Sequence, residues 1–240
     1  MSIAGYDPSG GAGLLADVKT MEQLKVQGLG VCTAMTLQTE SQCLSLNWQP
    51  LEEILKSIDI LMKNYHVEAI KIGVVKDAEF LTEIVKTIKY NNPEAKIVWD
   101  PVLKSTSDFS FFDLNTISEL GNVLKQIDLI TPNYNEHKVL QENNLFEESE
   151  NSCSILIKGG HREDKIGTDI LIQNGKEISI QPNDETLIYY PKHGSGCVLS
   201  SAIVSHLALG KNVEKACRNG KLYIENFLTS NPALLGFHSN

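Results

Sequence analysis

The stretch AIKIGVVKDAEFLTEIVKTIKYNNPEAKIVWDPV, residues 69–102, decides which fold class this chain adopts. Its first apolar run ends at Gly73, and a second run, KIVW, ends at Asp100. Between them, after Asp77, apolar residues recur at helical spacing: Phe80, Leu81, Ile84, Val85 and Ile88. A strand, a helix and a second strand in this order predict a βαβ unit with two parallel strands and a right-handed crossover.

The same alternation continues toward both ends of the chain. On the N-terminal side we expect a strand at 2–5, a helix that stops at Gly28, a buried strand at 30–38, an edge strand around Leu44, Leu46 and Trp48, and a helix at 51–65. On the C-terminal side we expect a helix at 116–126, the strand DLIT, a short helix near Glu136, the strand SILIK, and helices at 197–209 and 213–228. Asn174-Gly175, between DILIQ and KEISI, predicts a two-residue hairpin.

These units predict an α/β fold, a three-layer αβα sandwich with a mostly parallel central sheet. No linker, low-complexity segment or fixed-period repeat interrupts the pattern, so we expect residues 1–240 to form a single domain. The chain starts only a few residues before its first glycine loop, and we therefore expect a short first strand.

Composition narrows the class of protein. No apolar run is long enough to span a bilayer, and Met1 leads directly into SIAGYDP without a basic segment, so we expect a cytoplasmic protein without membrane attachment. A net charge of −9 without a basic cluster argues against a nucleic-acid partner. The five cysteines are scattered and form no CxxC pair, which favours reduced thiols over disulfides or a zinc site.

Ligands of such sheets bind at the carboxyl ends of the strands. The first loop at that edge is DPSGGAG, residues 7–13, which ends where a helix begins. Its glycines would let the backbone approach a ligand and leave N–H groups free, but a plain tight turn explains them equally well. The loop matches neither a Walker A loop nor the dinucleotide-binding fingerprint.

Polar residues follow three further strands. Asp100 ends one, Asn133 and Glu136 follow the next, and Lys158 ends a third, before Gly159 and Gly160. Asp100 and Asn133 could simply cap helices. Together, however, Asp100 and Glu136 could hold Mg²⁺ through water, and Lys158 could reach a polyphosphate.

The segment HGSGCVLSSA, residues 193–202, opens a long helix. The N–H groups of Gly194, Ser195, Gly196 and Cys197 can converge on an anion there, and the helix dipole favours negative charge. A helix N-terminus also lowers the pKa of a thiol. Cys197 could be a buried structural cysteine, but its place in the first turn after two glycines favours a role in the site.

Seven motifs cover nearly the whole chain. In order they are SIAGYDPSGGAGLLADVKT, TAMTLQTES, KIG, DPV, TPNYNEHKVL, ILIKGGH and HGSGCVLSSAIVSHLALG. With them the chain resembles the ribokinase-like superfamily and, within it, the hydroxymethylpyrimidine/phosphomethylpyrimidine kinases of thiamine biosynthesis. The cysteine that closes GSGC is typical of these kinases and of some pyridoxal kinases, whereas the wider superfamily has a catalytic aspartate there.

The resemblance implies ATP and Mg²⁺ as cofactors, a small pyrimidine as substrate and a homodimer as assembly. It implies the following site residues. Catalytic residues would be Gly194, Ser195, Gly196, Cys197 and Lys158; the substrate would contact Gln38, Gly11, Ala12, Asp17, Val102 and Val74. Asn133, Glu136, Lys158 and Gly160 would lie on the nucleotide side, and Asp100 and Glu136 beside Mg²⁺. Val74 stands where a methionine is common, so that side of the pocket would be roomier.

Several alternatives stay open at this stage. Cys197 could accept the hydroxyl proton or only orient the hydroxyl. Three other functions fit the sequence: a pyridoxine/pyridoxal kinase, a non-catalytic pyrimidine- or nucleotide-binding relative, and a cysteine-nucleophile transferase. Gln38 and the GGAG loop favour the pyrimidine kinase. Residues 141–154 are short and acidic where the family has a full helix, so we expect one helical turn and a loop there.

Overall fold

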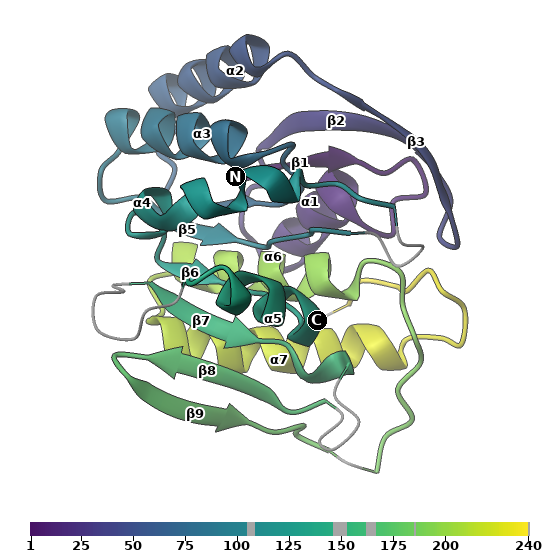
Figure 1. Cartoon of the computed structure of the whole chain (residues 1–240). Coiled ribbons are helices and arrows are strands. Elements are labelled where there is room, and N and C mark those ends of the chain that lie inside the picture. Colours follow the sequence, from purple (N-terminus) through teal and green to yellow (C-terminus); the bar gives the residue numbers. More distant parts are fainter. Residues whose placement is uncertain (105–108, 146–152, 162–166, 185, 240) are drawn as a thin grey trace.

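The computed structural model describes residues 1–104, 109–145, 153–161, 167–184 and 186–239. Within these ranges one sheet of nine strands, ordered β3-β2-β1-β4-β5-β6-β7-β8-β9, crosses the molecule (Figure 1). The strands are β1 (Ser2–Tyr6), β2 (Gly30–Gln38), β3 (Cys43–Trp48), β4 (Ala69–Ile72), β5 (Lys96–Trp99), β6 (Leu129–Ile130), β7 (Ser154–Ile157), β8 (Asp169–Gln173) and β9 (Lys176–Ile180).

The helices connect these strands. They are α1 (Gly13–Gln23), α2 (Leu51–Asn64), α3 (Ala78–Asn91), α4 (Gly121–Leu124), α5 (Tyr134–Glu142), α6 (Ser195–Ala208) and α7 (Val213–Thr229), with 3₁₀ turns at η1 (Leu114–Leu120) and η2 (Gly159–His161). None of the helices in the described ranges is long and apolar enough to cross a membrane.

Strands β2, β1, β4, β5, β6 and β7 pair in parallel, as the βαβ pattern predicts. Strand β3 pairs antiparallel at one edge, and β8 and β9 do so at the other. The predicted hairpin at Asn174-Gly175 is confirmed: both residues have positive φ, 51° and 70°, as a type I′ turn requires. Strand β1 has five residues and pairs with β2 and β4.

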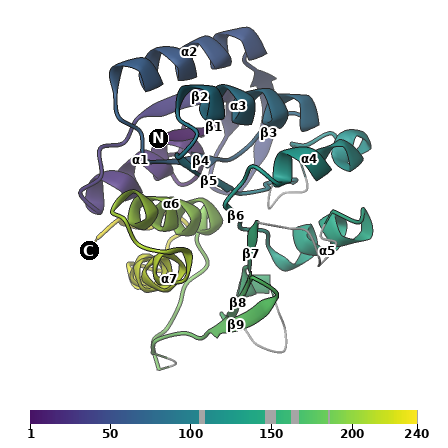
Figure 2. The same ribbon diagram turned by 90° about the vertical axis from the view of Figure 1, so that its left-hand side faces the viewer.

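Helices cover both faces of the sheet, so the sandwich prediction is confirmed. Alternate residues of the parallel strands point to opposite faces, where two separate apolar clusters form. Ile70, Ile97 and Trp99 pack toward α2, α3 and α4, and Ala69 and Val98 pack toward α1, α6 and α7. In Figure 2, α6 and α7 lie on one side of the strands and α4 and α5 on the other.

One local prediction was wrong. The single helix expected at 116–126 is a 3₁₀ turn followed by one turn of α4. Asp113 caps it, and the Thr116 hydroxyl donates to the Asp113 carbonyl and accepts from the Ala78 amide, which ties this segment to the start of α3. The short helix expected near Glu136 is confirmed as α5, which a full capping box starts. Of residues 141–154, for which we expected one helical turn and a loop, 146–152 lie outside the described ones.

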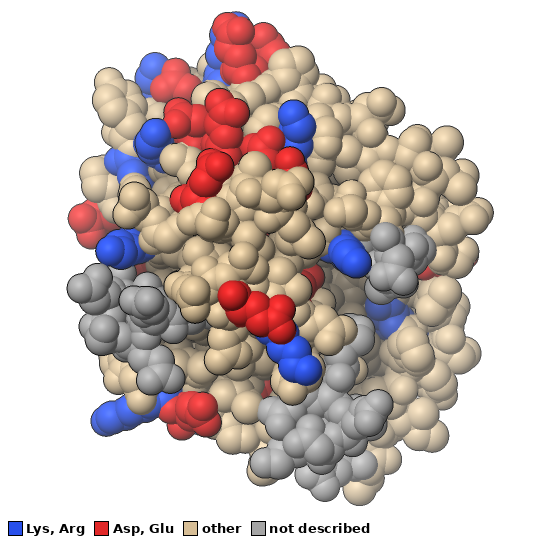
Figure 3. Space-filling view, viewed as in Figure 1, with Lys and Arg blue, Asp and Glu red and all other residues tan. Residues whose placement is uncertain are grey.

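Acidic and basic side chains pair along the outer helices α2 and α3. Glu52, Glu53, Asp59 and Glu83 lie on α2 and α3 and pair with lysines of the same helices. Figure 3 shows these acidic and basic side chains intermixed over that part of the surface. The pairs are exposed, so solvent screens the attraction and they add little to stability.

Candidate active site

A pocket of about 280 Å³ opens at the carboxyl ends of the parallel strands. Thirteen of the residues expected at the site line it: Ala12, Gln38, Val74, Asp100, Val102, Asn133, Glu136, Lys158, Gly160, Gly194, Ser195, Gly196 and Cys197. They come from loops far apart in sequence, which meet because parallel strands place their carboxyl ends at one edge.

The first wall of the pocket consists of two glycine loops in direct contact. Gly194 has φ +73°, and a Cβ at this residue would lie 2.0 Å from the Gly11 carbonyl oxygen. A Cβ at Gly13, where φ is +56°, would lie 2.3 Å from the Gly5 oxygen. Only glycine allows these close approaches, so the residues 7–13 and 193–197 form one backbone surface.

His193 and Asp7 join the same two loops. His193 Nε2 lies 2.9 Å from Asp7 Oδ2, and Asp7 also accepts hydrogen bonds from the Ser9 and Ala12 amides. The His193 bond is foremost among the interactions that hold the pKa of Asp7 below its usual value, although burial acts in the opposite direction. Asp7 is therefore a fixed anion that organises both loops. His193, which directly precedes Gly194, therefore orders the glycine turn.

Cys197 lies in the first turn of α6. The helix has Gly194 at its N-cap and no side chain caps it, so its first amides remain directed toward the pocket. Burial raises the pKa of the Cys197 thiol above its usual value, and the Lys71 ammonium and a hydrogen bond from the Gly13 amide oppose this. The helix N-terminus therefore does not make Cys197 a ready thiolate: the thiol is protonated at neutral pH.

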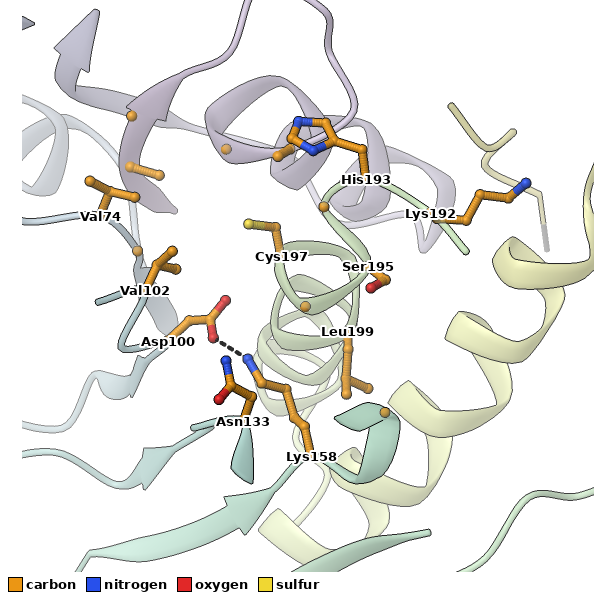
Figure 4. A pocket seen from close by; sticks show the side chains of 18 of the residues that line it. Val74, Asp100, Val102, Asn133, Lys158, Lys192, His193, Ser195, Cys197 and Leu199 are labelled. Atoms are coloured by element: carbon orange, nitrogen blue, oxygen red, sulfur yellow. Dashed lines mark hydrogen bonds and ion pairs between the residues drawn. The ribbon is translucent and has the colours of Figure 1, made fainter. Parts of the chain in front are cut away.

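Lys158 and Asp100 form the polar centre of the pocket. Lys158 Nζ lies 2.7 Å from Asp100 Oδ1, the contact drawn in Figure 4. Asp100, only 1% exposed, also accepts from Thr131 and from Ser200 of α6. A Cβ at Gly196 would lie 3.1 Å from Lys158 Nζ, so the ammonium lies against the glycine turn. The lysine is thus fixed between an anion and the start of α6.

Glu136 and Asn133 form the capping box of α5. The Glu136 carboxylate accepts from the Asn133 amide at 2.7 Å, and Asn133 Oδ1 accepts from the Glu136 amide at 2.9 Å. Burial raises the pKa of Glu136 to about 7, with Lys158 opposing and Asp100 adding to the shift. Asn133 therefore serves as a cap, while its neighbour is a carboxyl group that changes charge near neutral pH.

The residues present fit Mg²⁺ held largely by water. Among the described residues, no group of three or more His, Cys, Asp or Glu could form a closed metal site. Asp100 and Glu136 nevertheless follow the neighbouring strands β5 and β6, both line the pocket, and the Asp100 charge helps to raise the pKa of Glu136. One or two carboxylates with several waters and substrate phosphates are the usual surroundings of Mg²⁺.

The opposite wall of the pocket is less polar. Val74 follows β4, Val102 follows β5 and Gln38 ends β2, and the pocket also contacts Thr36 and Phe111. In this arrangement two apolar side chains can pack against a flat ring, and one amide can form hydrogen bonds with its polar edge.

Two expected contacts are not part of the pocket lining. Asp17 is fully buried and paired with Lys71, Ser2 and Ser201, so its acceptor positions are occupied. Gly11 packs behind the surface: a Cβ there would meet Leu235 and the His193 ring within 2.7 Å. Both residues support the site from behind instead of contacting its contents.

Three lysines that line the pocket, Lys71, Lys192 and Lys221, were not predicted as site residues. Lys71 lies in an apolar strand, and Lys221 lies in a segment that reads as a solvated helix face. Lys221 is in fact 6% exposed, pairs with Asp169 at 3.1 Å and lines the pocket. Lys192 also lines it, but its ammonium bonds the Asn231 and Ala233 carbonyls and points away from the other side chains in Figure 4. Lys71 and Lys221 are brought to the site by the fold, whereas Lys192 directly precedes His193 in the sequence.

Comparison with protein families matches residues 7–239 to the family described as phosphomethylpyrimidine kinase. A hydroxymethylpyrimidine/phosphomethylpyrimidine kinase of Aquifex aeolicus is 30% identical over 98% of this chain and 95% of its own length. A kinase with the same description from Saccharomyces cerevisiae is 33% identical over 94% of this chain. The chain spans 45% of the length of that yeast relative.

Solved structures share the fold. Phosphomethylpyrimidine kinase from Clostridium difficile superposes with a TM-score of 0.75 at 31% identity, covering 93% of this chain and 96% of that one. A Bacillus subtilis pyridoxal kinase, solved as an ADP complex, superposes with a TM-score of 0.80 at 23% identity, covering 95% and 91%. The second match concerns the fold alone, and together they confirm the ribokinase-like architecture.

Proposed function

The chain belongs to the phosphomethylpyrimidine kinase family, and on this premise we propose that it transfers the γ-phosphoryl group of ATP to 4-amino-5-hydroxymethyl-2-methylpyrimidine and then to its monophosphate. The observation that carries the proposal is one pocket with Gln38 and two valines on one side and the glycine turn with Lys158 on the other. Such a pocket suits a flat polar ring next to a polyphosphate.

Phosphoryl transfer needs little covalent chemistry from the protein; positioning and charge stabilisation supply most of the rate. The free amides at the start of α6 would donate to the oxygens of the transferring group. Lys158, held against Gly196 and Asp100, would share the same charge. Both groups are in place before substrate arrives, so their reorganisation costs little.

Cys197 would orient the acceptor group. Because burial raises the pKa of its thiol, Cys197 is neutral at pH 7 and suits an orienting role better than that of a ready base. A phosphate as the second acceptor needs no base at all. Glu136 and Asp100 would hold Mg²⁺ through water, and the ion, when bound, would neutralise phosphate charge.

ATP is the phosphoryl donor in this proposal. The pyridoxal kinase with the same fold is solved as an ADP complex, which supports ATP as the nucleotide. Leu199, Ile224 and Leu228 form an apolar part of the lining next to Lys221 and would suit a purine ring. Residues 1–240 would act as one kinase domain.

We also propose a homodimer, which the family resemblance implies. Strand β3 lies at the edge of the sheet, and Met35, Leu37 and Leu44 of β2 and β3 are 44%, 60% and 60% exposed. Apolar side chains at an open edge are a common place for subunits to associate. Sedimentation equilibrium of the wild type and Leu44→Lys tests this: the proposal expects a dimer that the substitution weakens.

The function is tested by measuring ADP release with ATP·Mg²⁺ and each of three acceptors: hydroxymethylpyrimidine, its monophosphate and pyridoxal. The proposal expects turnover of both pyrimidines. In Gln38→Leu, kcat/KM for the pyrimidines should fall by roughly a hundredfold, because an amide partner of the ring is lost, while the KM for ATP should not change. Turnover of pyridoxal alone would favour a pyridoxal kinase, and ATP binding without turnover would favour a binding protein.

A further inference from the structure

Lys71 lies in the centre of strand β4, between Ile70 and Ile72, and its side chain is fully buried. It points to the sheet face covered by α1 and α6, where Ala69 and Val98 pack against apolar residues of both helices. A lysine here displaces apolar volume from the core and removes an ammonium group from water, which carries a large desolvation cost.

Asp17 of α1 is the partner that makes this burial possible. Lys71 Nζ lies 2.5 Å from Asp17 Oδ1, and both side chains are 0% exposed. Ser201 of α6 donates to the same oxygen at 2.6 Å, and Ser2 donates to Oδ2 at 2.5 Å. These hydrogen bonds hold the pair in one orientation.

The other side of the ammonium faces the active site. Lys71 Nζ lies 3.5 Å from the Cys197 carbonyl oxygen, and Lys71 belongs to the pocket lining, whereas Asp17 does not. The pair is therefore a fixed dipole under the first turn of α6, with its positive end toward Cys197. Stability alone does not explain it, since apolar residues of similar volume fill such positions without desolvation.

We propose, building on the proposed kinase function, that Lys71 is a positioning residue whose ammonium, oriented by Asp17, stabilises negative charge at the Cys197 side chain and at the acceptor oxygen beside it. Lys71 contacts neither ATP nor acceptor in this arrangement. It acts through the first turn of α6, to which it bonds, and through its charge.

The other charges around Cys197 do not replace Lys71. Asp17 and Asp100 both disfavour the thiolate, and Lys158, although cationic, is neutralised by Asp100 at 2.7 Å. The Gly13 amide donates to the sulfur, and the N-terminus of α6 adds its own partial positive charge. Of the charged groups that oppose the burial of Cys197, Lys71 is the foremost.

The test is the pH dependence of Cys197 alkylation by iodoacetamide, followed by mass spectrometry of the peptide that contains Cys197. Lys71→Met removes the ammonium, and we expect the apparent pKa of Cys197 to rise by about one unit or more, with a roughly tenfold slower reaction at pH 8. Because this variant leaves Asp17 without its cation, Lys71→Met/Asp17→Asn removes both charges and keeps a folded, hydrogen-bonded core. A smaller rise should remain there, because the Asp17 charge, which disfavours the thiolate less strongly than Lys71 favours it, is removed as well.

Ser201→Ala is the matched control. It removes a hydrogen bond to Asp17 from the same helix but leaves both charges, so its alkylation curve should match the wild type. An unchanged curve in the folded double variant, or an equal shift in Ser201→Ala, would overturn the proposal. Alkylation requires no turnover, so an inactive wild type with the expected shift would reject the kinase function and leave this role of Lys71 standing.

Discussion

His193 Nε2 and Asp7 Oδ2 lie 2.9 Å apart and join two glycine loops that are 186 residues apart in sequence. The His193 side chain is 12% exposed and that of Asp7 is 1% exposed, so water competes little for the contact. Through this bond the loop before α1 fixes the turn before α6. The geometry of the proposed anion-binding amides therefore depends on a pair that itself contacts no phosphate in our account.

We expect His193→Ala to lower kcat by roughly tenfold or more, because a small displacement of positioned groups is costly in catalysis. His193→Gln should retain most of the activity, since its side-chain amide can still donate to Asp7. Steady-state kinetics of both variants with the pyrimidine acceptor checks this. Equal losses in the two variants would show that the hydrogen bond to Asp7 is not the feature that matters.

Lys158→Met should lower kcat by about a hundredfold to a thousandfold, the usual effect of removing one group that stabilises transferring charge. The same change leaves Asp100 buried without its cation, so the folded fraction must be measured alongside. Lys76→Met serves as the control and should leave kcat unchanged, because the Lys76 side chain is 52% exposed and does not line the pocket. Wild-type kcat in Lys158→Met would remove Lys158 from the chemistry.

The raised pKa of Glu136 predicts an unusual dependence of protein stability on pH. Its pKa is raised from 4.5 to about 7 in the fold, so the folded state favours the protonated form. The stability that protonated Glu136 contributes is therefore fully present below pH 4.5, and it is lost as the pH rises through about 7. Without Mg²⁺, Glu136→Gln should gain about 2 kcal/mol in free energy of unfolding over the wild type between pH 5 and pH 8.

Urea unfolding of both proteins at several pH values measures this difference. The same variant should lose kinase activity, because a neutral amide is a poor partner for Mg²⁺. A difference in stability that stays constant with pH would mean that Glu136 has an ordinary pKa in the folded protein.

Gly194 and Gly210 provide a matched pair of substitutions. Both have positive φ, +73° and +76°, but a Cβ at Gly194 would lie 2.0 Å from the Gly11 oxygen, whereas a Cβ at Gly210 meets nothing within 4 Å. Gly210→Ala should therefore cost only about 1 kcal/mol of backbone strain. Gly194→Ala should cost several times more and abolish turnover, as thermal unfolding and ADP release would show.

Much of the fold followed from local pattern. The apolar runs around Ile70 and Val98 and the helical spacing from Phe80 to Ile88 fix a βαβ unit, since both faces of a parallel sheet are covered. The 114–124 segment was harder, because the bond between Thr116 and the start of α3 is not local. Chain periodicity carries no information about such a contact.

The site, like the fold, could be predicted from the sequence only in part. The loops after the strands placed Asp100, Glu136, Lys158 and Cys197 together, because topology alone brings strand ends to one edge. Asp17, expected as a substrate contact, is buried against Lys71 and does not line the pocket; the sequence does not show that Lys71 faces it across the core. The pKa of Cys197 was misjudged for a similar reason: the dipole of α6 is visible in sequence, but burial of the thiol is not.

The most direct test of the central claim is ³¹P NMR of wild-type protein with hydroxymethylpyrimidine and excess ATP·Mg²⁺. Our account predicts a phosphomonoester resonance first and then the two resonances of a pyrimidine diphosphate, with ADP formed in step and neither product from Lys158→Met. Release of inorganic phosphate alone, or phosphorylation of pyridoxal but not of the pyrimidine under the same conditions, would contradict the account.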